Sequence, residues 1–289
     1  MVAVLRRGFA ILALLLDPVR HISSLKGTVG VLSNNLKMAI VLAGHDLKSR
    51  YSGQFLGFIW NILHPLFLML VFLFIFGVVF KQKIGGTVEL PRDYTVYLLS
   101  GLVPWLSMSA VLVTGATSVI GNANLVKQFS FPPEIFPIKE IILSMVFWSV
   151  GMIIIFSYQL YTYHYLLWTY TLIPIALFIH IGTLLGLCWS LSAVSVFVRD
   201  VKDIMTLFVI AGMYVLPIIY LPAWVPDMFK PIIYLNPFSY LIWCYQDALY
   251  FGRIEHPEAW VVATVVMLLS LSFGFRVFQR LKPMFGNAL

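Results

Sequence analysis

The stretch LKSRYSGQFLGFIWNILHP, residues 47–65, joins two segments of opposite character, and the organisation of the chain follows from it. Before it, charged and apolar residues alternate at the spacing of a helix with one apolar stripe and one charged face. From Phe55 to Phe80 there is no Asp, Glu, Lys or Arg, and a helix of that length can cross a bilayer. The pattern predicts a surface helix that leads directly into a spanning one, with Gly53 and Gly57 at the bend.

The composition indicates a membrane protein. Of the 289 residues, 61% are apolar and 11% are charged, against about 25% charged in soluble domains. A soluble protein of this size needs a polar shell that this sequence cannot supply. Cys188 and Cys244 stand in apolar and aromatic runs without a CxxC or histidine pattern, so we expect packing residues rather than a disulfide or a metal site. The fold class that follows is all-α integral membrane.

Charge-free runs predict six transmembrane helices. The expected bounds are Phe58–Phe80, Tyr94–Ile120, Ile141–Tyr161, Trp168–Phe197, Ile204–Leu221 and Ala259–Phe275. The run from Ile141 to Val198 is too long for one crossing, and its aromatic stretch Tyr161–Tyr165 is the expected turn.

Lysine and arginine residues are divided unequally between the two sides of this arrangement. The termini and the two loops on their side carry 14 of them, and the opposite side carries five. The positive-inside rule therefore places the N- and C-termini in the cytoplasm, and we expect a multi-pass protein of the cytoplasmic (inner) membrane. This topology also accounts for the net charge of +7, so no nucleic-acid partner is needed to explain it.

The chain divides into four expected regions: a leader at 1–33, an amphipathic interface helix at 34–57, a six-span domain at 58–278 and a cytoplasmic tail at 279–289. In the leader, Arg6-Arg7 and an apolar run resemble the start of a signal peptide. No small-residue cleavage site follows, and we interpret the leader as an interfacial segment. The helix at 34–57 is either a membrane-surface anchor or a contact surface for a cytoplasmic partner.

The cytoplasmic loop at 121–140 contains a helix start at Pro132-Pro133-Glu134, because proline suits the first turn and an acid suits its positive end. Four apolar side chains lie beside it on the loop: Phe129, Phe131, Ile135 and Phe136. They either dip into the lipid headgroups or insert into a groove of a partner protein.

The external segment at 217–257 is interrupted by prolines and is rich in aromatic residues. This pattern predicts short re-entrant helices in the outer half of the membrane, where surrounding protein must satisfy the backbone. Asp247 and Arg253 are expected to face water at the membrane surface.

The sequence lacks the residue patterns typical of coupling-ion, nucleotide-binding and catalytic sites. No span interior carries an acidic or basic residue, which ion-coupled transporters use to bind the coupling ion. There is no G-x-x-x-x-G-K-[ST] motif for nucleotide and no spacing of acids, bases or nucleophiles typical of catalysis. We predict a protein that is not an enzyme, holds no metal and no cofactor, and takes its energy from another chain.

Four ordered motifs resemble one family. They are DLKSRY (46–51) followed by Trp60 and Pro65, GLVPW (101–105), NANLVK (122–127) running into FPPEIFP (131–137), and PIIY (217–220) with Asn236-Pro237 and DAL (247–249). Together they are similar to the membrane subunits of polysaccharide-exporting ABC transporters of the ABC-2 type. The resemblance covers about residues 34–280.

This resemblance implies a type V exporter fold and a homodimer that pairs with two cytoplasmic P-loop ATPase subunits, which bind ATP and Mg²⁺. Its substrate is implied to be a lipid-linked polysaccharide such as O-antigen, moved through a channel at the homodimer interface. The residues implied to couple to the ATPase are Asp46, Lys48, Arg50, Tyr51, Lys127, Phe131, Pro132, Pro133 and Glu134. Those implied to form an external gate are Tyr220, Trp224, Tyr234, Asn236, Pro237 and Tyr240.

Aromatic rings suit such a channel, because sugars pack their C–H faces on rings and a sliding polymer needs many weak contacts. Trp60, Trp105, Trp148 and Tyr158 are the candidates for lining it, although aromatic residues in membrane proteins also pack in the core or face lipid. Two alternatives stay open: an ABC-2 permease for a drug or small lipid, and a membrane assembly scaffold without transport. A neighbouring gene for a P-loop ATPase, with or without polymer-biosynthesis genes, separates the three.

Overall fold

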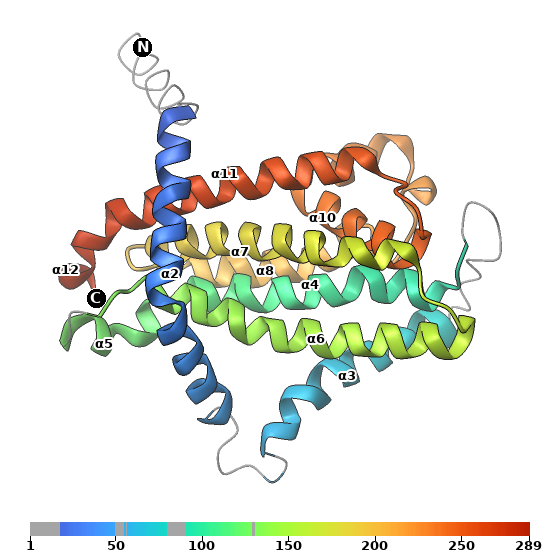
Figure 1. The fold of residues 1–289 in the computed structure, drawn as a ribbon, viewed down its shortest axis with the longest axis horizontal. Coiled ribbons are helices and arrows are strands. Elements are labelled where there is room, and N and C mark those ends of the chain that lie inside the picture. The colour runs from blue at the N-terminus through green and yellow to red at the C-terminus, as the bar shows by residue number, and fades with distance from the viewer. Residues whose placement is uncertain (1–17, 50–54, 56, 80–90, 129–130) are drawn as a thin grey trace.

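The computed structural model describes residues 18–49, 55, 57–79, 91–128 and 131–289. Long helices run side by side in a bundle, and one helix, α2 (Pro18–Ser49), crosses an end of it almost at right angles (Figure 1). The long helices of the bundle are α4 (Tyr94–Ala116), α6 (Ile135–Tyr163), α7 (Ile173–Ser195) and α11 (Pro257–Leu281). The arrangement is that of a membrane domain with a helix lying along its surface.

Helix α2 begins 16 residues before the predicted interface helix, so the expected boundary between residues 33 and 34 falls inside a continuous helix. Its earlier half packs on α11, where a Cβ at Gly27 would lie 2.6 Å from the ring of Phe275 and His21 Nδ1 lies 2.5 Å from the Ser272 hydroxyl. After α2, Gly57 has a φ of +48°, the left-handed backbone expected at the bend, while Gly53 lies outside the described residues.

Five helices in the described ranges are long and apolar enough to cross a membrane: Ile62–Val79, Tyr94–Ala116, Ile135–Tyr163, Trp168–Ser195 and Pro257–Ala288. They match five of the six predicted spans. The first is built from α3 (Trp60–Phe72), which follows the one-turn helix η1 (Gly57–Ile59), and the π-helix η2 (Leu73–Val79). Only 11% of it is buried, against 78% for α4, so α4 is the enclosed centre and α3–η2 presents its surface outward.

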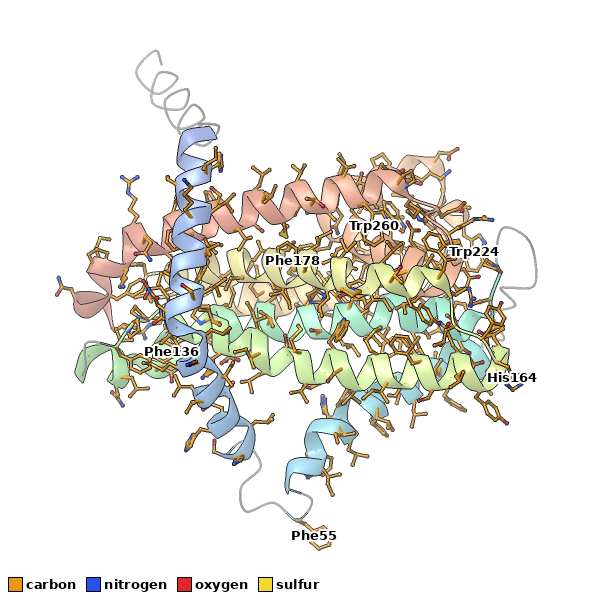
Figure 2. All side chains as sticks on the ribbon, viewed as in Figure 1. Phe55, Phe136, His164, Phe178, Trp224 and Trp260 are labelled. Carbon is orange, nitrogen blue, oxygen red and sulfur yellow. The ribbon has the colours of Figure 1, made fainter. Side chains whose placement is uncertain are left out.

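The turn between α6 and α7 lies where the sequence predicted it. Helix α6 ends at Tyr163, and His164 adopts the left-handed conformation with a φ of +60°, which stops the helix. The short helix η4 (Trp168–Leu172) then leads into α7. Figure 2 places His164 at the end of the bundle opposite to Phe136.

The remaining predicted span, Ile204–Leu221, is the fifth in chain order and corresponds to α8 (Val201–Val215), which ends six residues early. With 15 residues it is about 22 Å long, shorter than the roughly 30 Å of bilayer hydrocarbon. The cause is Pro217, because the residue before a proline is pushed out of helical geometry, and Leu216 is extended at φ −76° and ψ 152°.

Short helices occupy the two ends of the bundle. At one end are η3 (Ile120–Asn122), α5 (Ala123–Gln128), η8 (Lys282–Met284) and α12 (Phe285–Ala288), here named the α5 end (Figure 1). The other, the α10 end, has η5 (Pro222–Trp224), η6 (Asp227–Phe229), α9 (Lys230–Tyr234), α10 (Pro237–Gln246) and the π-helix η7 (Asp247–Phe251). The short-helix form of segment 217–257 is as predicted. The expected tail at 279–289 instead begins inside α11.

Helices α7 and α11 approach so closely that their backbones touch. A Cβ at Gly274 would lie 1.8 Å from the carbonyl oxygen of Gly186, and one at Gly186 would lie 2.1 Å from the backbone of Ser270. Only glycine fits at such a crossing, as is typical of small residues at helix contacts inside membranes.

Candidate functional site

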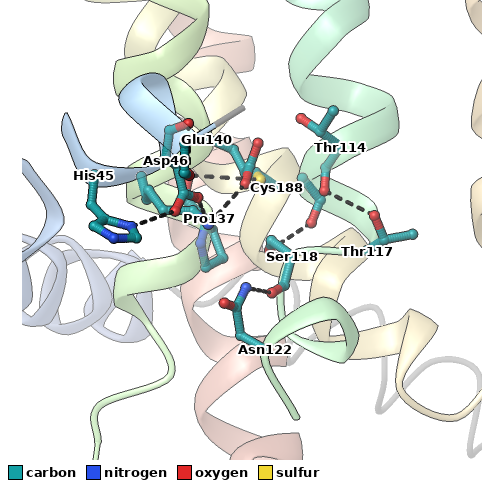
Figure 3. A network of polar contacts seen from close by, with 12 residues as sticks. His45, Asp46, Thr114, Thr117, Ser118, Asn122, Pro137, Glu140 and Cys188 are labelled. Atoms are coloured by element: carbon teal, nitrogen blue, oxygen red, sulfur yellow. Dashed lines mark hydrogen bonds and ion pairs between the residues drawn. The ribbon is translucent and has the colours of Figure 1, made fainter. Parts of the chain in front are cut away.

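The α5 end contains a charged contact between the surface helix and the bundle. Lys139, near the start of α6, donates a hydrogen bond from Nζ to the Asp46 carboxylate of α2 at 2.5 Å and lies 3.4 Å from the Glu140 carboxylate. The Lys139 side chain is 7% exposed and that of Asp46 is 37% exposed. Figure 3 shows Asp46 next to His45 and Glu140 in this network. Because the lysine is buried between two acids, the contact ties α2 to α6.

A second ion pair joins the start of α6 to the end of α11. The Glu134 carboxylate accepts hydrogen bonds from Lys282 Nζ at 2.7 Å and from Gln279 Nε2 at 2.9 Å. Its backbone carbonyl accepts another from the indole of Trp189 on α7, at 3.3 Å. Glu134 is 4% exposed. Three helices therefore converge on this one residue.

The apolar residues of the loop at 121–140 do not project outward as the sequence suggested. Ile135 and Phe136 are fully buried, and Phe131 is partly buried with its ring stacked on Phe136 at 5.4 Å. These residues pack in the subunit because α6 starts at Ile135 and turns their side chains inward. Phe129 lies outside the described residues.

The predicted coupling residues therefore differ in how exposed their side chains are. Lys48 on α2 and Lys127 on α5 are exposed, Asp46, Phe131 and Pro132 are half-buried, and Pro133 and Glu134 are buried. Arg50 and Tyr51 lie outside the described residues. Helix α5 follows a turn held by Asn122, whose side-chain amide donates to the Ser118 carbonyl at 2.7 Å (Figure 3). Of the predicted coupling residues, Lys48 and Lys127 are thus the two that the structure shows exposed at this end.

At the α10 end, side chains hold the non-helical backbone that follows α8. The Pro217 carbonyl accepts from Gln246 Nε2 at 2.8 Å and from the Tyr97 hydroxyl at 3.2 Å. Tyr97 also donates to the Tyr220 carbonyl at 2.9 Å, and Tyr94 to the Ile219 carbonyl at 2.8 Å. These contacts satisfy carbonyl groups that have no helical partner, which is the condition for irregular backbone at membrane depth.

The expected gate residues shape the short helices. Asn236 caps α10 by accepting from the Phe238 amide at 3.0 Å, and Pro237 is its first residue, the position that best tolerates proline. The hydroxyl of Tyr240 donates to the Tyr234 carbonyl at 2.7 Å, which joins α10 to α9.

Three gate candidates differ in their surroundings. Tyr220 donates its hydroxyl to the Val215 carbonyl at 2.7 Å and is half-buried. Trp224 and Tyr234 are 49% and 44% exposed. Trp224 lies at the α10 end of the bundle in Figure 2.

Asp247 is fully buried, which corrects the expectation that it faces water. Its carboxylate accepts hydrogen bonds from the His256 amide at 3.1 Å, from His256 Nδ1 at 2.9 Å and from the Trp260 indole at 3.1 Å. Arg253 is 45% exposed and pairs with Glu255 at 2.6 Å. On η6 and α9, the hydrogen bond and charge of Lys230 lower the pKa of Asp227, and the hydrogen bond and charge of Asp227 raise the pKa of Lys230.

Asp93 is a second structural acid at this end. It caps α4 by accepting from the Val96 amide at 3.3 Å, and it also accepts from the hydroxyls of Tyr158 and Tyr163. The neighbouring Arg92 is buried and donates to the Tyr250 carbonyl at 2.5 Å. Tyr158, predicted to line a channel, is thus bound to Asp93 and half-buried.

The other channel candidates lie in three different environments. Trp105 is 1% exposed and packs against Gly212, Phe208 and Phe238, so it is a core residue of the subunit and not part of its surface. Trp148 is half-buried and donates to the Tyr245 hydroxyl at 3.0 Å, which lies 3.1 Å from His180 Nδ1. Trp60 is 36% exposed.

No cluster of three or more His, Cys, Asp or Glu side chains suited to a metal ion occurs within the described ranges. Cys188 and Cys244 are both buried free thiols, as expected of packing residues. The buried acids Glu134 and Asp247 are held by internal hydrogen bonds. This arrangement fixes helices in place.

The comparisons with known proteins agree with this geometry. The family model described as ABC-2 type transporter matches residues 39–250. The chain belongs to the ABC-2 type transporter family. It is therefore a multi-pass membrane protein and a non-catalytic permease component of a transporter.

Two relatives of this permease carry the same description, O-antigen export system permease protein RfbA. The one from Klebsiella pneumoniae is 26% identical over 254 residues, which cover 87% of this chain and 95% of the relative. The one from Myxococcus xanthus is 24% identical with the same coverage.

The sequence of the permease does not reveal the partners of its charged residues. Lys139 and Lys282 were counted only as topology signals, yet they neutralise Asp46 and Glu134. Their partners lie 93 and 148 residues away in the chain. No local pattern could have identified such pairs.

Proposed function

We propose that this chain is the permease subunit of an ATP-driven exporter that moves a lipid-linked, O-antigen-like polysaccharide across the cytoplasmic membrane. The observation that carries the proposal is the similarity to the two permeases named for O-antigen export, which extends over 87% of this chain. The interiors of the spans predicted from the sequence support it, because they carry no Asp, Glu, Lys or Arg to bind a coupling ion, which favours an ATPase as the energy source.

We propose six crossings, with α8 and the non-helical residues 216–221 together forming the fifth. The hydrogen bonds from Tyr94, Tyr97 and Gln246 support this assignment, because they satisfy carbonyl groups of this non-helical backbone internally. An even number of crossings puts both termini on the same side of the membrane, and the positive-inside rule makes that side the cytoplasm. The α5 end then faces the cytoplasm, and the short helices of the α10 end lie outside.

The active unit is a homodimer with a channel between two copies of this chain. The outward surfaces of α3–η2 and α8 support this part of the proposal. Only 11% of the α3–η2 span is buried within the subunit, and Leu207, Ile210 and Tyr214 on α8 are 70%, 58% and 60% exposed. Trp60 and Trp148 remain channel candidates, whereas Trp105 packs inside the subunit.

Two copies of a cytoplasmic P-loop ATPase bind at the α5 end. Lys48, Lys127 and Asp46 supply the contact, and Phe131 and Glu134 support it from inside by holding the start of α6 in place. This division of roles follows from exposure, since a fully buried carboxylate cannot reach a partner protein.

The test is co-purification of the tagged full-length chain from its own cells in a mild detergent, with ATPase activity measured in the eluate. We expect an ATPase to co-purify with the intact chain. We expect Lys127→Glu to lower the ATPase activity in the eluate at least fivefold. Met228→Glu is the matched control, because Met228 is 77% exposed at the α10 end and lies on the opposite side of the membrane.

Isolation of the chain alone, without ATPase activity, contradicts the transporter assignment. The substrate is tested separately by deleting the gene and staining the cell surface for polysaccharide. Unchanged surface polysaccharide in the deletion strain contradicts the O-antigen-like substrate while leaving the ATPase partner intact.

A further inference from the structure

A pocket at the α10 end includes one expected gate residue, Tyr234, and no ligand has been assigned to it so far. It lies between the start of α4, the short helices η5 and α9, one side of α10 and the residues before α11, and we name it the Tyr234 pocket. Its volume is about 360 Å³, within the range of about 300–1,000 Å³ that small-molecule sites occupy.

Aromatic rings form one wall of the Tyr234 pocket. The Tyr234 ring lies 5.3 Å from the ring of Trp243, and Trp243 stacks on the His256 ring at 5.2 Å with an interplanar angle of 5°. Phe251 packs edge-on against His256 at 5.4 Å. Trp243 is almost completely buried, so it fixes the wall from behind, and the exposed Tyr234 is the ring that a ligand meets.

The polar side chains of the pocket are held by neighbours outside it. His256 Nδ1 is bound to the buried Asp247, which leaves Nε2 as the ring nitrogen for a ligand. Gln246 is held by the Pro217 carbonyl, and Glu255 by Arg253. Side chains already fixed in this way lose little conformational freedom when they bind a ligand.

The charge of the pocket indicates which ligand it suits. No Lys or Arg is among the described residues that line it, and the guanidinium of Arg253 balances the one lining carboxylate, Glu255. No Lys or Arg side chain is therefore available in this lining to bind a phosphate group. A neutral ring with an apolar C–H face and several hydroxyls fits the aromatic wall and the polar side chains, since the face packs on an aromatic ring and the hydroxyls bond to Glu255 and His256.

We propose that the Tyr234 pocket binds one neutral sugar ring, stacked on Tyr234 and hydrogen-bonded to Glu255 and His256. The proposal rests on the proposed function only in what it says about the source of the sugar. On that function, the bound sugar is a unit of the exported polymer as the polymer leaves the subunit. On that topology the pocket lies on the external side, where it holds a sugar unit away from the channel entrance.

The test is saturation-transfer NMR on the full-length chain in lipid nanodiscs. The probes are the methyl glycosides of glucose, galactose, mannose and N-acetylglucosamine, with glycerol 3-phosphate and phosphocholine as charged comparisons. We expect transfer to the ring protons of at least one glycoside and to neither charged probe. Tyr234→Leu should weaken binding about fivefold, the loss expected for one aromatic contact.

Two control variants keep the test specific. Tyr234→Phe retains the ring and should bind as the unaltered chain does. Phe229→Leu removes an aromatic side chain that is 48% exposed in the same segment but does not line the pocket, and it should also leave binding unchanged.

Absence of transfer to every glycoside, transfer only to the charged probes, or equal binding by Tyr234→Leu would each overturn the proposal. This readout needs no ATPase and no export. Absence of sugar binding together with normal ATPase co-purification therefore contradicts the proposed sugar site but not the proposed function. Intact sugar binding without a co-purifying ATPase contradicts the proposed function but not the sugar site.

Discussion

At the scale of single residues, buried polar side chains hold the places where the chain leaves regular helix. Gln246 and Tyr97 bind the carbonyl of Pro217, and Asp247 binds the backbone and ring of His256. Such contacts could not be read from the sequence. Asp247 follows an apolar, aromatic run and suggested a water-facing acid, because its partners are set by the packing of a later segment rather than by adjacent residues.

Replacing Asp247 by alanine should destabilise the protein strongly. The substitution leaves the amide and imidazole of His256 and the indole of Trp260 without their shared acceptor. We expect a loss of about 3 kcal/mol in the free energy of unfolding, because unsatisfied buried donors carry the full cost of desolvation. Unfolding curves of the detergent-solubilised protein in increasing SDS measure it.

Asp227→Ala is the matched control for Asp247→Ala. Asp227 is an acid of the same segment, but its side chain is 93% exposed and it pairs with Lys230 on the surface. We expect its unfolding curve to overlay that of the unaltered protein. Equal effects of the two substitutions would show that the hydrogen bonds of Asp247 do not stabilise the fold.

At the scale of helices, charge-free runs predicted where the spans lie, but the sequence did not predict where every helix begins. Five predicted spans coincide with helices because a charge-free run in a bilayer has few alternatives to a helix. The start of α2 was missed, since Gly27 and Gly30 weaken the local helix signal. Contacts with Phe275 and Ser272 on α11, more than 240 residues later, hold that part of the helix in place.

Gly274→Ala should disrupt the contact between α7 and α11. The added methyl group would overlap the carbonyl oxygen of Gly186, and backbone atoms cannot rotate away as a side chain can. We expect a loss of about 2 kcal/mol or more in the free energy of unfolding, at the upper side of the usual cost of overpacking. The same SDS unfolding curves report it.

Gly30→Ala provides the comparison within a helix. A Cβ at Gly30 has no neighbour within 4 Å, so alanine should stabilise α2 by up to about 1 kcal/mol through helix propensity alone. If Gly274→Ala behaved like Gly30→Ala, the close approach of α7 and α11 would be incorrect.

At the scale of the whole molecule, charge placement predicts which end of the bundle lies in the cytoplasm. Exposed lysines gather at the α5 end, while the α10 end carries aromatic residues and a few ion pairs of its own. Both native thiols are buried, Cys188 at 1% and Cys244 at 0% exposure. The protein therefore has a low background for labelling at introduced cysteines.

Cysteine labelling should confirm six crossings. Met228→Cys should react with a membrane-impermeant maleimide on intact spheroplasts, and Lys127→Cys should react only after the membrane is permeabilised. Both positions are exposed at opposite ends of the subunit. Labelling of both variants from the same side would rule out the proposed orientation, and the unaltered chain serves as the blank.

The glycine contact between α7 and α11 also has a mechanical consequence. With backbone packed on backbone at Gly186 and Gly274, neither helix can slide past the other without a steric collision, and no acyl chain can enter between them. We therefore expect the pair to move as one rigid body. If the proposed ATPase drives the transport cycle, we expect its shape change to leave this pair intact and to shift the outward-facing helices α3 and α8 against it.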